Sequence, residues 1–146
     1  MRRALVTGIN GQDGSYLAEL LLERGYEVIG LVREGAGDRL GRIQHMRNEL
    51  EVIEGSLLDD ALLRRVLADH RPNEIYNFAA RASSSQLLTD PTLTAEYNGL
   101  AVVRLLEAIR AVDPGIRFCQ ASSSEMFGTV TQSPLNELTP FRPRNP

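Results

Sequence analysis

The sequence predicts an α/β fold, a doubly wound parallel sheet with helices packed on both faces. Three observations predict it. Short apolar segments typical of buried strands alternate with longer segments whose apolar residues recur at helical spacing. A glycine-rich turn directly follows the first apolar segment. Hydrophobic residues make up 42% and charged residues 24% of the 146 residues, as in an ordinary globular domain.

The predicted elements follow one another without an internal repeat. Strands are expected over residues 4–7, 26–32, 52–53, 74–80 and 116–121, and helices over 15–24, 43–50, 58–69 and 91–112. The apolar face of the long helix is expected to consist of Leu100, Val103, Leu106 and Ile109. Strands that alternate with helices in this way form parallel βαβ units with right-handed crossovers.

Composition excludes several classes of protein. The net charge of −3 is too small to indicate a nucleic-acid or membrane-surface partner, and no apolar run is long enough to span a bilayer. A single cysteine, Cys119, forms no internal disulfide, which favours a reducing, cytoplasmic location. Cys119 falls in an apolar strand pattern, so we expect it to pack as a small buried hydrophobe.

The first strand–helix junction carries the strongest motif. It reads Thr7-Gly8-Ile9-Asn10-Gly11-Gln12-Asp13-Gly14. Gly8 permits a tight turn, Gly11 allows the backbone to approach a pyrophosphate, and Gly14 lets the helix pack closely on the strand. The helix start then presents N–H groups to the phosphates, so the motif predicts a dinucleotide site.

The end of the second strand bears on the choice of cofactor. An acidic residue there binds the ribose 2′-hydroxyl of NAD, whereas an arginine binds the 2′-phosphate of NADP. The sequence places Arg33 first and Glu34 second. Because Arg33 comes directly after the apolar run and its planar fork matches a phosphate, we expect NADP rather than NAD.

Hydroxyl groups and a carboxylate follow the fifth strand. Ser122, Ser123, Ser124 and Glu125 lie where ligands bind in open α/β sheets, outside the carboxyl ends of the strands. Taken alone, this segment fits a sugar-binding site and a simple polar strand end about equally.

The glycine motif with its Gln-Asp-Gly-Ser-Tyr-Leu run, and the later Gln-Ala-Ser-Ser-Ser-Glu run, resemble the extended short-chain dehydrogenase/reductase family, most closely its GDP-mannose 4,6-dehydratase branch. The segments Glu74–Asn77, Leu105–Arg110 and Thr139–Pro146 share the likeness. The resemblance implies a Rossmann-like NAD(P)-binding fold and a GDP-mannose substrate. It implies a homodimer or homotetramer, in which residues 33–42 reach a neighbouring subunit and the helix from Pro91 forms part of the interface.

Site residues follow from the same resemblance. The cofactor is expected to contact Gly8, Asn10, Gly11, Gln12, Asp13, Gly14, Arg33, Ser56, Leu57, Ala79 and Ala80. Ser123 would bind the sugar C4 oxygen, and Glu125 would remove the C5 proton before water leaves from C6. No metal is expected.

The sequence also departs from the family. Ser56 replaces an Asp that commonly contacts the adenine, Glu34 replaces a second Arg, and Ala79–Ser84 differs from the usual sequence beside the nicotinamide ribose. Arg81 lies within that stretch. It could contact a phosphate or carboxylate of a substrate, but a surface position is slightly favoured.

The family's catalytic Tyr and Lys have no counterpart. All sixteen basic residues are Arg, and no Tyr follows Tyr97. We therefore expect residues 1–128 to form the dinucleotide-binding domain, and residues 129–146 to begin the connection to a Tyr/Lys helix and a substrate portion outside this chain. The 146 residues alone are expected to be inactive.

Two alternatives remain open at this point. One is a sugar-nucleotide epimerase or reductase of the same family, which would not need Glu125 as a base. The other is a non-catalytic NADP-binding protein or pseudoenzyme that keeps the fold.

Overall fold

The computed structural model describes residues 1–146 except 37–39, 83–87, 131–132 and 146. Its centre is a sheet of five parallel strands in the order β3-β2-β1-β4-β5. The predicted doubly wound parallel sheet is confirmed. The strands are β1 (Arg3–Thr7), β2 (Glu27–Val32), β3 (Leu50–Glu54), β4 (Glu74–Asn77) and β5 (Arg117–Gln120).

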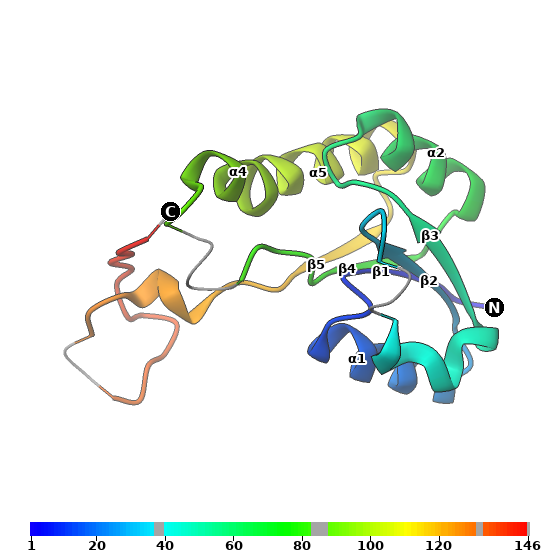
Figure 1. Ribbon diagram of the computed structural model, residues 1–146, viewed down its shortest axis with the longest axis horizontal. Helices are drawn as coiled ribbons and strands as arrows, with labels where there is room; N and C mark the ends of the chain where they lie inside the picture. Colours follow the sequence, from blue (N-terminus) through cyan, green and yellow to red (C-terminus); the bar gives the residue numbers. More distant parts are fainter. Residues whose placement is uncertain (37–39, 83–87, 131–132, 146) are drawn as a thin grey trace.

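Helices cover both faces of this sheet (Figure 1). On one face lie α1 (Gln12–Glu23) and a 3₁₀ helix, η2 (Gly41–Glu49). On the other lie α2 (Asp60–His70), α4 (Pro91–Ala95), a π-helical turn, η3 (Glu96–Leu100), and α5 (Ala101–Val112). A second 3₁₀ helix, η4 (Ser124–Phe127), follows β5.

Alternation along β1 divides the core into two layers. Leu5 packs with the residues under α2 and α5, whereas Ala4 and Val6 pack with those under α1 and η2. All three are at most 1% exposed, as expected for a central strand covered on both faces.

The long helix does not bury the face that its sequence predicts. Leu100, Val103 and Leu106 are 52%, 55% and 43% exposed, and of the four predicted residues only Ile109 is buried. Within α5 the buried residues Ala101, Leu105, Ala108 and Ile109 recur at regular helical spacing, so the helix buries a neighbouring apolar face. The prediction for this face was therefore wrong in phase.

The expectation for Cys119 was also wrong, because its side chain is exposed. Cys119 lies on β5, at the edge of the sheet, in register with Tyr76. Since β1 alternates in the same phase, Cys119 faces the side on which α1 packs. Among the described residues, α1 packs on β1 and β2 and no helix reaches β5 on that face.

Other boundaries differ by a few residues. β4 ends at Asn77 rather than at residue 80, and Leu50 belongs to β3 rather than to the preceding helix. Residues 37–39 of the segment 33–42 that is expected to reach a neighbouring subunit, and Ser83 and Ser84 of the altered stretch, lie outside the described residues. None of the helices in the described part of the chain is long and apolar enough to cross a membrane.

Candidate functional site

The turn between β1 and α1 has a conformation that favours glycine. Gly8 has a φ of 67°, and a Cβ there would lie 2.9 Å from the backbone nitrogen of Ala79. The Gly11 N–H donates to the Gly8 carbonyl at 2.8 Å and closes the turn. A Cβ on Gly14 would overlap the same carbonyl, so α1 packs directly against the turn.

The start of α1 is left open for an anion. Gly11 is the N-cap residue, and no side chain of the described residues caps the first turn. Its N–H groups and the positive end of the helix dipole favour a negatively charged ligand group. The backbone at Gly11 carries no side chain that would hold such a group away.

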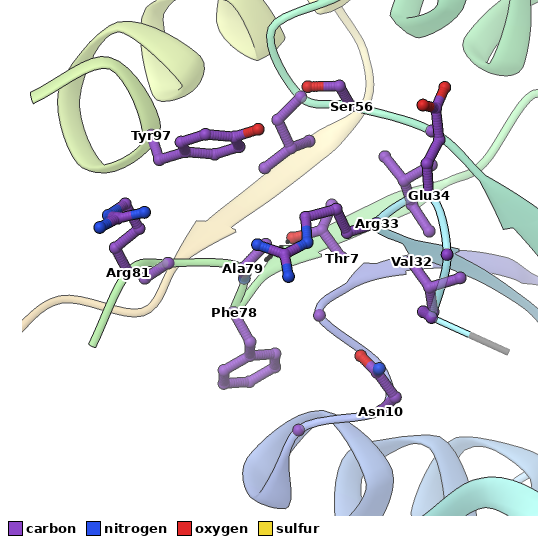
Figure 2. Close-up of a pocket in the computed structure, with 18 residues that line it drawn as sticks. Thr7, Asn10, Val32, Arg33, Glu34, Ser56, Phe78, Ala79, Arg81 and Tyr97 are labelled. Atoms are coloured by element: carbon purple, nitrogen blue, oxygen red, sulfur yellow. Dashed lines mark hydrogen bonds between the residues drawn. The ribbon is translucent and has the colours of Figure 1, made fainter. Parts of the chain in front are cut away.

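A cavity of about 290 Å³ opens beside the glycine turn (Figure 2). Its walls come from the carboxyl ends of β1, β2 and β4, from the segment that follows β3, and from the π-helical turn. Such a position, at the carboxyl edge of a parallel sheet, is where α/β proteins bind their ligands.

Most of the predicted cofactor residues meet at this cavity. Its lining includes Gly8, Asn10, Gly11, Arg33, Ser56, Leu57, Ala79 and Ala80. The remaining three, Gln12, Asp13 and Gly14, form the first turn of α1 and do not line it.

The two charged residues after β2 both line the cavity but point differently. Figure 2 shows the Arg33 guanidinium in the middle of the cavity and the Glu34 carboxylate directed away from it. Ser56, on the segment after β3, accepts a hydrogen bond from the Leu58 N–H at 3.1 Å. Its hydroxyl proton is available for a ligand.

Sequence reasoning missed part of the lining. Arg81 lines the cavity, although it was predicted more readily as a surface residue. Tyr97, on the π-helical turn, lines it as well, on the far side from Asn10 in Figure 2. No motif marks Tyr97, since only the packing of the long helix brings it to the cavity.

A row of polar side chains, buried at Thr7 and Asn77 and exposed at Gln120, joins the carboxyl ends of three strands. The Thr7 hydroxyl donates to Asn77 Oδ1, and Asn77 Nδ2 donates to Gln120 Oε1 at 2.7 Å. The Ala79 N–H donates in turn to Thr7 Oγ1 at 3.2 Å. Thr7 and Asn77 are at most 1% exposed, so these bonds satisfy groups that water does not reach. The row extends from the glycine turn to the end of β5.

Ser123 and Glu125 lie together just after β5, outside the cavity lining. Ser123 caps η4 by accepting from the Glu125 N–H at 3.1 Å. The Glu125 carboxylate accepts from Asn145 Nδ2 at 2.9 Å. The segment around Asn145 is held by the Arg142 N–H, which donates to Met126 O at 2.9 Å. Both predicted catalytic residues are exposed.

Glu74 and Tyr76, whose pKa values are shifted, form a network at the opposite, amino-terminal edge of the sheet. The Tyr76 hydroxyl donates to Glu74 at 2.7 Å, and Arg117 forms an ion pair with the same carboxylate. The Tyr76 hydrogen bond and then the Arg117 charge hold the pKa of Glu74 below its usual value. The bond to Glu74 raises the pKa of Tyr76 to about 12. Because these groups lie at the far edge from the cavity, their role is structural. In the part of the chain that the structure describes, no group of His, Cys, Asp and Glu is arranged to hold a metal ion.

Strand order, glycine turn and cavity together define the class of protein, a Rossmann-like domain. Residues 5–146 match the family described as GDP-mannose 4,6 dehydratase. The chain belongs to this family.

Comparison with a named relative agrees with this assignment. A GDP-mannose 4,6-dehydratase of Yersinia enterocolitica is 41% identical over 155 residues, which cover 100% of this chain and 42% of that protein. The chain therefore spans less than half the length of this curated relative.

Solved structures of related enzymes share the fold. The UDP-glucose 4-epimerase of Thermotoga maritima, solved with UDP-glucose, superposes with a TM-score of 0.86 and 27% identity, over 98% of this chain and 45% of that one. The Bordetella bronchiseptica enzyme WbmH, solved with NAD+, gives a TM-score of 0.82 and 29% identity, over 98% of this chain and 46% of that one.

Proposed function

We propose that this chain is the dinucleotide-binding part of an NADP-dependent 4,6-dehydratase that acts on GDP-mannose. The observation that carries the proposal is the cavity built on the glycine turn of a chain from this family. The related WbmH structure, which contains NAD+, supports a nicotinamide dinucleotide as the ligand.

The described residues fit such a ligand. A diphosphate would lie at Gly11 and the uncapped start of α1, where N–H groups face it. The adenosine half would extend past Arg33 towards Ser56 and Leu57, at the ends of β2 and β3. The other half would extend past Ala79 and Ala80, on the β4 side of the turn.

Preference for NADP over NAD rests on Arg33. Its guanidinium lies in the cavity and suits the dianionic 2′-phosphate, whereas the Glu34 carboxylate points away. Glu34 is still close enough to line the cavity, so its charge opposes the phosphate and moderates the preference.

Chemistry would take place at the end of β5. A nicotinamide, if bound, would supply the hydride acceptor for oxidation at the sugar C4 and the hydride donor for C6. The Ser123 hydroxyl would hydrogen-bond the C4 oxygen. The Glu125 carboxylate would take the C5 proton, which is acidic beside the C4 ketone, and would deliver a proton as hydroxide leaves C6 as water. The C4 hydroxyl proton would pass to a base such as the family's Tyr, and C5 would take up a proton again once the hydride is at C6, so that the net change is the loss of one water.

The carboxylate of Glu125 favours dehydration over the epimerase alternative. An epimerase such as the Thermotoga relative changes the configuration at C4, and that reaction does not require removal of the C5 proton. In a protein that carries this segment together with a Tyr/Lys pair, Glu125→Gln is therefore expected to lower kcat for GDP-mannose at least about a hundredfold. An unchanged kcat would favour an epimerase or reductase.

A polypeptide of these 146 residues alone is not expected to turn over GDP-mannose, since it contains no Lys and no Tyr beyond Tyr97. Binding of the dinucleotide should persist. Release of the 4-keto-6-deoxy product by the isolated chain, followed by chromatography, would contradict this expectation.

We also propose self-association through the outer face of α5, where Leu100, Val103 and Leu106 are exposed. The family resemblance supports this proposal, because the corresponding helix forms part of the family's subunit interface.

The cofactor proposal is tested by titrating the chain with NADP+ and with NAD+ by calorimetry. We expect tighter binding of NADP+. Arg33→Ala should weaken NADP+ binding about tenfold and leave NAD+ binding nearly unchanged, because one charge-assisted phosphate contact is lost. Arg65→Ala, on the exposed surface of α2 and outside the cavity lining, is the matched control. Equal loss of both ligands in Arg33→Ala would contradict a role in selecting the phosphate.

A further inference from the structure

The π-helical turn Glu96–Leu100 makes an unusual contact with the segment that follows β4. Arg81 N–H donates to Asn98 Oδ1 at 2.8 Å, and Asn98 Nδ2 donates to the Arg81 carbonyl at 3.0 Å. The Asn98 side chain thus binds both the backbone N–H and the backbone carbonyl of one residue, Arg81, which lies 17 positions away in the sequence. Such a two-point contact fixes the backbone in distance and in orientation.

The other end of the same segment is fixed from the glycine turn. The Phe78 N–H donates to Thr7 O, and the Ala79 N–H to Thr7 Oγ1, each at 3.2 Å. Gly8 packs so closely on Ala79 that a Cβ would not fit between them. Residues 79–81 therefore run from an anchor on β1 to an anchor on the π-helical turn.

This doubly anchored segment forms one wall of the cavity. Ala79, Ala80 and Arg81 all line it, and so does Tyr97, the neighbour of Asn98 on the π-helical turn (Figure 2). A π-helical turn is wider than an α-helical one, and such turns often occur at functional sites. Here Tyr97 of the turn lines the cavity, and the next residue, Asn98, binds the backbone of the cavity wall at Arg81.

We infer that Asn98 is a positioning residue of the dinucleotide site: its two hydrogen bonds to Arg81 hold the 79–81 wall at the separation from the helix that the ligand requires. Asn98 itself does not line the cavity and acts through the backbone of its partner. The inference rests on the proposed dinucleotide function. Because the Asn98 side chain is exposed, its truncation leaves no buried cavity, and the fold should tolerate it.

The test uses the 146-residue chain, titrated with NADPH and followed by the fluorescence of the bound nucleotide. Asn98→Ala is expected to raise the Kd about tenfold, since two hydrogen bonds no longer hold the wall in place. Asn98→Asp keeps the acceptor for the Arg81 N–H and loses the donor to the Arg81 carbonyl. Its Kd should therefore lie between that of the wild type and that of Asn98→Ala. High ionic strength in all titrations screens the added charge.

A matched control is Asn136→Ala. Asn136 is also exposed and also bonds a backbone N–H, that of Leu138 at 2.9 Å, but it lies outside the cavity lining. Its Kd should equal that of the wild type. Without ligand, Asn98→Ala should keep the wild-type melting temperature, while the Arg81 amide exchanges its hydrogen faster than in the wild type.

The outcomes separate the two proposals. Wild-type chain that binds no NADPH overturns the proposed function. Wild-type chain that binds NADPH, with Asn98→Ala binding equally well, overturns the positioning role alone. A third outcome also overturns the positioning role. If Asn98→Ala binds NADPH more weakly, has a lowered melting temperature, and Asn98→Asp restores neither, then Asn98 contributes to general stability.

Discussion

Two residues of β4, Glu74 and Asn77, form side-chain networks at opposite ends of the sheet. Glu74, at the amino end, collects hydrogen bonds from Tyr76 and Tyr26 and an ion pair from Arg117. Asn77, at the carboxyl end, lies between Thr7 and Gln120 beside the cavity. The first group stabilises the sheet where no ligand is expected, and the second positions the backbone around the ligand site.

Glu74 gives the stability of the chain a defined pH dependence. Its pKa is lowered below 4.5 by the Tyr76 hydrogen bond and the Arg117 charge, so its stabilisation is fully present above pH 4.5 and is lost as the pH falls through the lower folded value. Tyr76, with its pKa raised from 10.0 to about 12, contributes below pH 10 and ceases to do so as the pH rises through 12.

Glu74→Gln is therefore expected to lower the free energy of unfolding at pH 7 by about 1–2 kcal/mol, because the buried Glu74 carboxylate loses the charge that strengthens its hydrogen bond from Tyr76 and its pairing with the largely exposed Arg117. Urea unfolding at several pH values measures this. The difference from the wild type should shrink as the pH falls below 4.5. A difference that stays constant down to pH 2 would contradict the role of the ionised carboxylate. Glu107→Gln, in an exposed helical pair with Arg110, serves as the control.

Of the residues predicted for the site, those with a local sequence signal line the cavity, and their role in binding stays a prediction. Gly8 and Gly11 are identified by their spacing after a strand, and Arg33 by its place directly after another. Tyr97 and Asn98 reach the site only because the long helix packs over β4. No local pattern encodes that approach, so sequence reasoning missed them.

Among the elements, the long helix shows best where sequence patterns fail. Its periodicity favoured a face through Leu100, Val103 and Leu106, yet these are exposed and Leu105 is fully buried. Apolar residues recur at helical spacing on two faces of α5, and periodicity alone does not show whether the face through Leu105 or the face through Leu106 packs on the sheet. The strands were predicted more reliably because parallel strands buried on both faces give continuous apolar runs.

Two neighbouring leucines test the corrected face. Leu105→Ala is expected to lower the free energy of unfolding by about 2–5 kcal/mol, since Leu105 is 0% exposed in the core. Leu106→Ala, at 43% exposed, should cost about 1 kcal/mol or less in the monomer. Denaturant unfolding at low protein concentration measures both. The reverse order would restore the face predicted from the sequence.

At the scale of the whole molecule, topology brings distant segments to one edge. The glycine turn, Arg33, the segment after β4 and the π-helical turn meet because parallel strands all end on the same side. Ser123 and Glu125 follow the neighbouring strand, β5, at that edge but lie outside the cavity lining. The cavity proposed to bind the dinucleotide thus lies within this chain, which spans 42% of the length of its Yersinia relative.

The central claim is that a dinucleotide binds on the glycine turn, and calorimetric titration of NADP+ into the 146-residue chain tests it most directly. The comparison variant is Gly11→Val, which adds a side chain at the turn proposed to hold the diphosphate. The backbone φ of −76° suits any residue, and the new Cβ would lie 3.0 Å from the Gly8 carbonyl oxygen. Circular dichroism and the melting temperature confirm that the variant folds. We expect one NADP+ per wild-type chain, and a Kd for Gly11→Val at least about a hundredfold higher. Failure of the folded wild-type chain to bind either NADP+ or NAD+, or equal binding by Gly11→Val, would contradict the account.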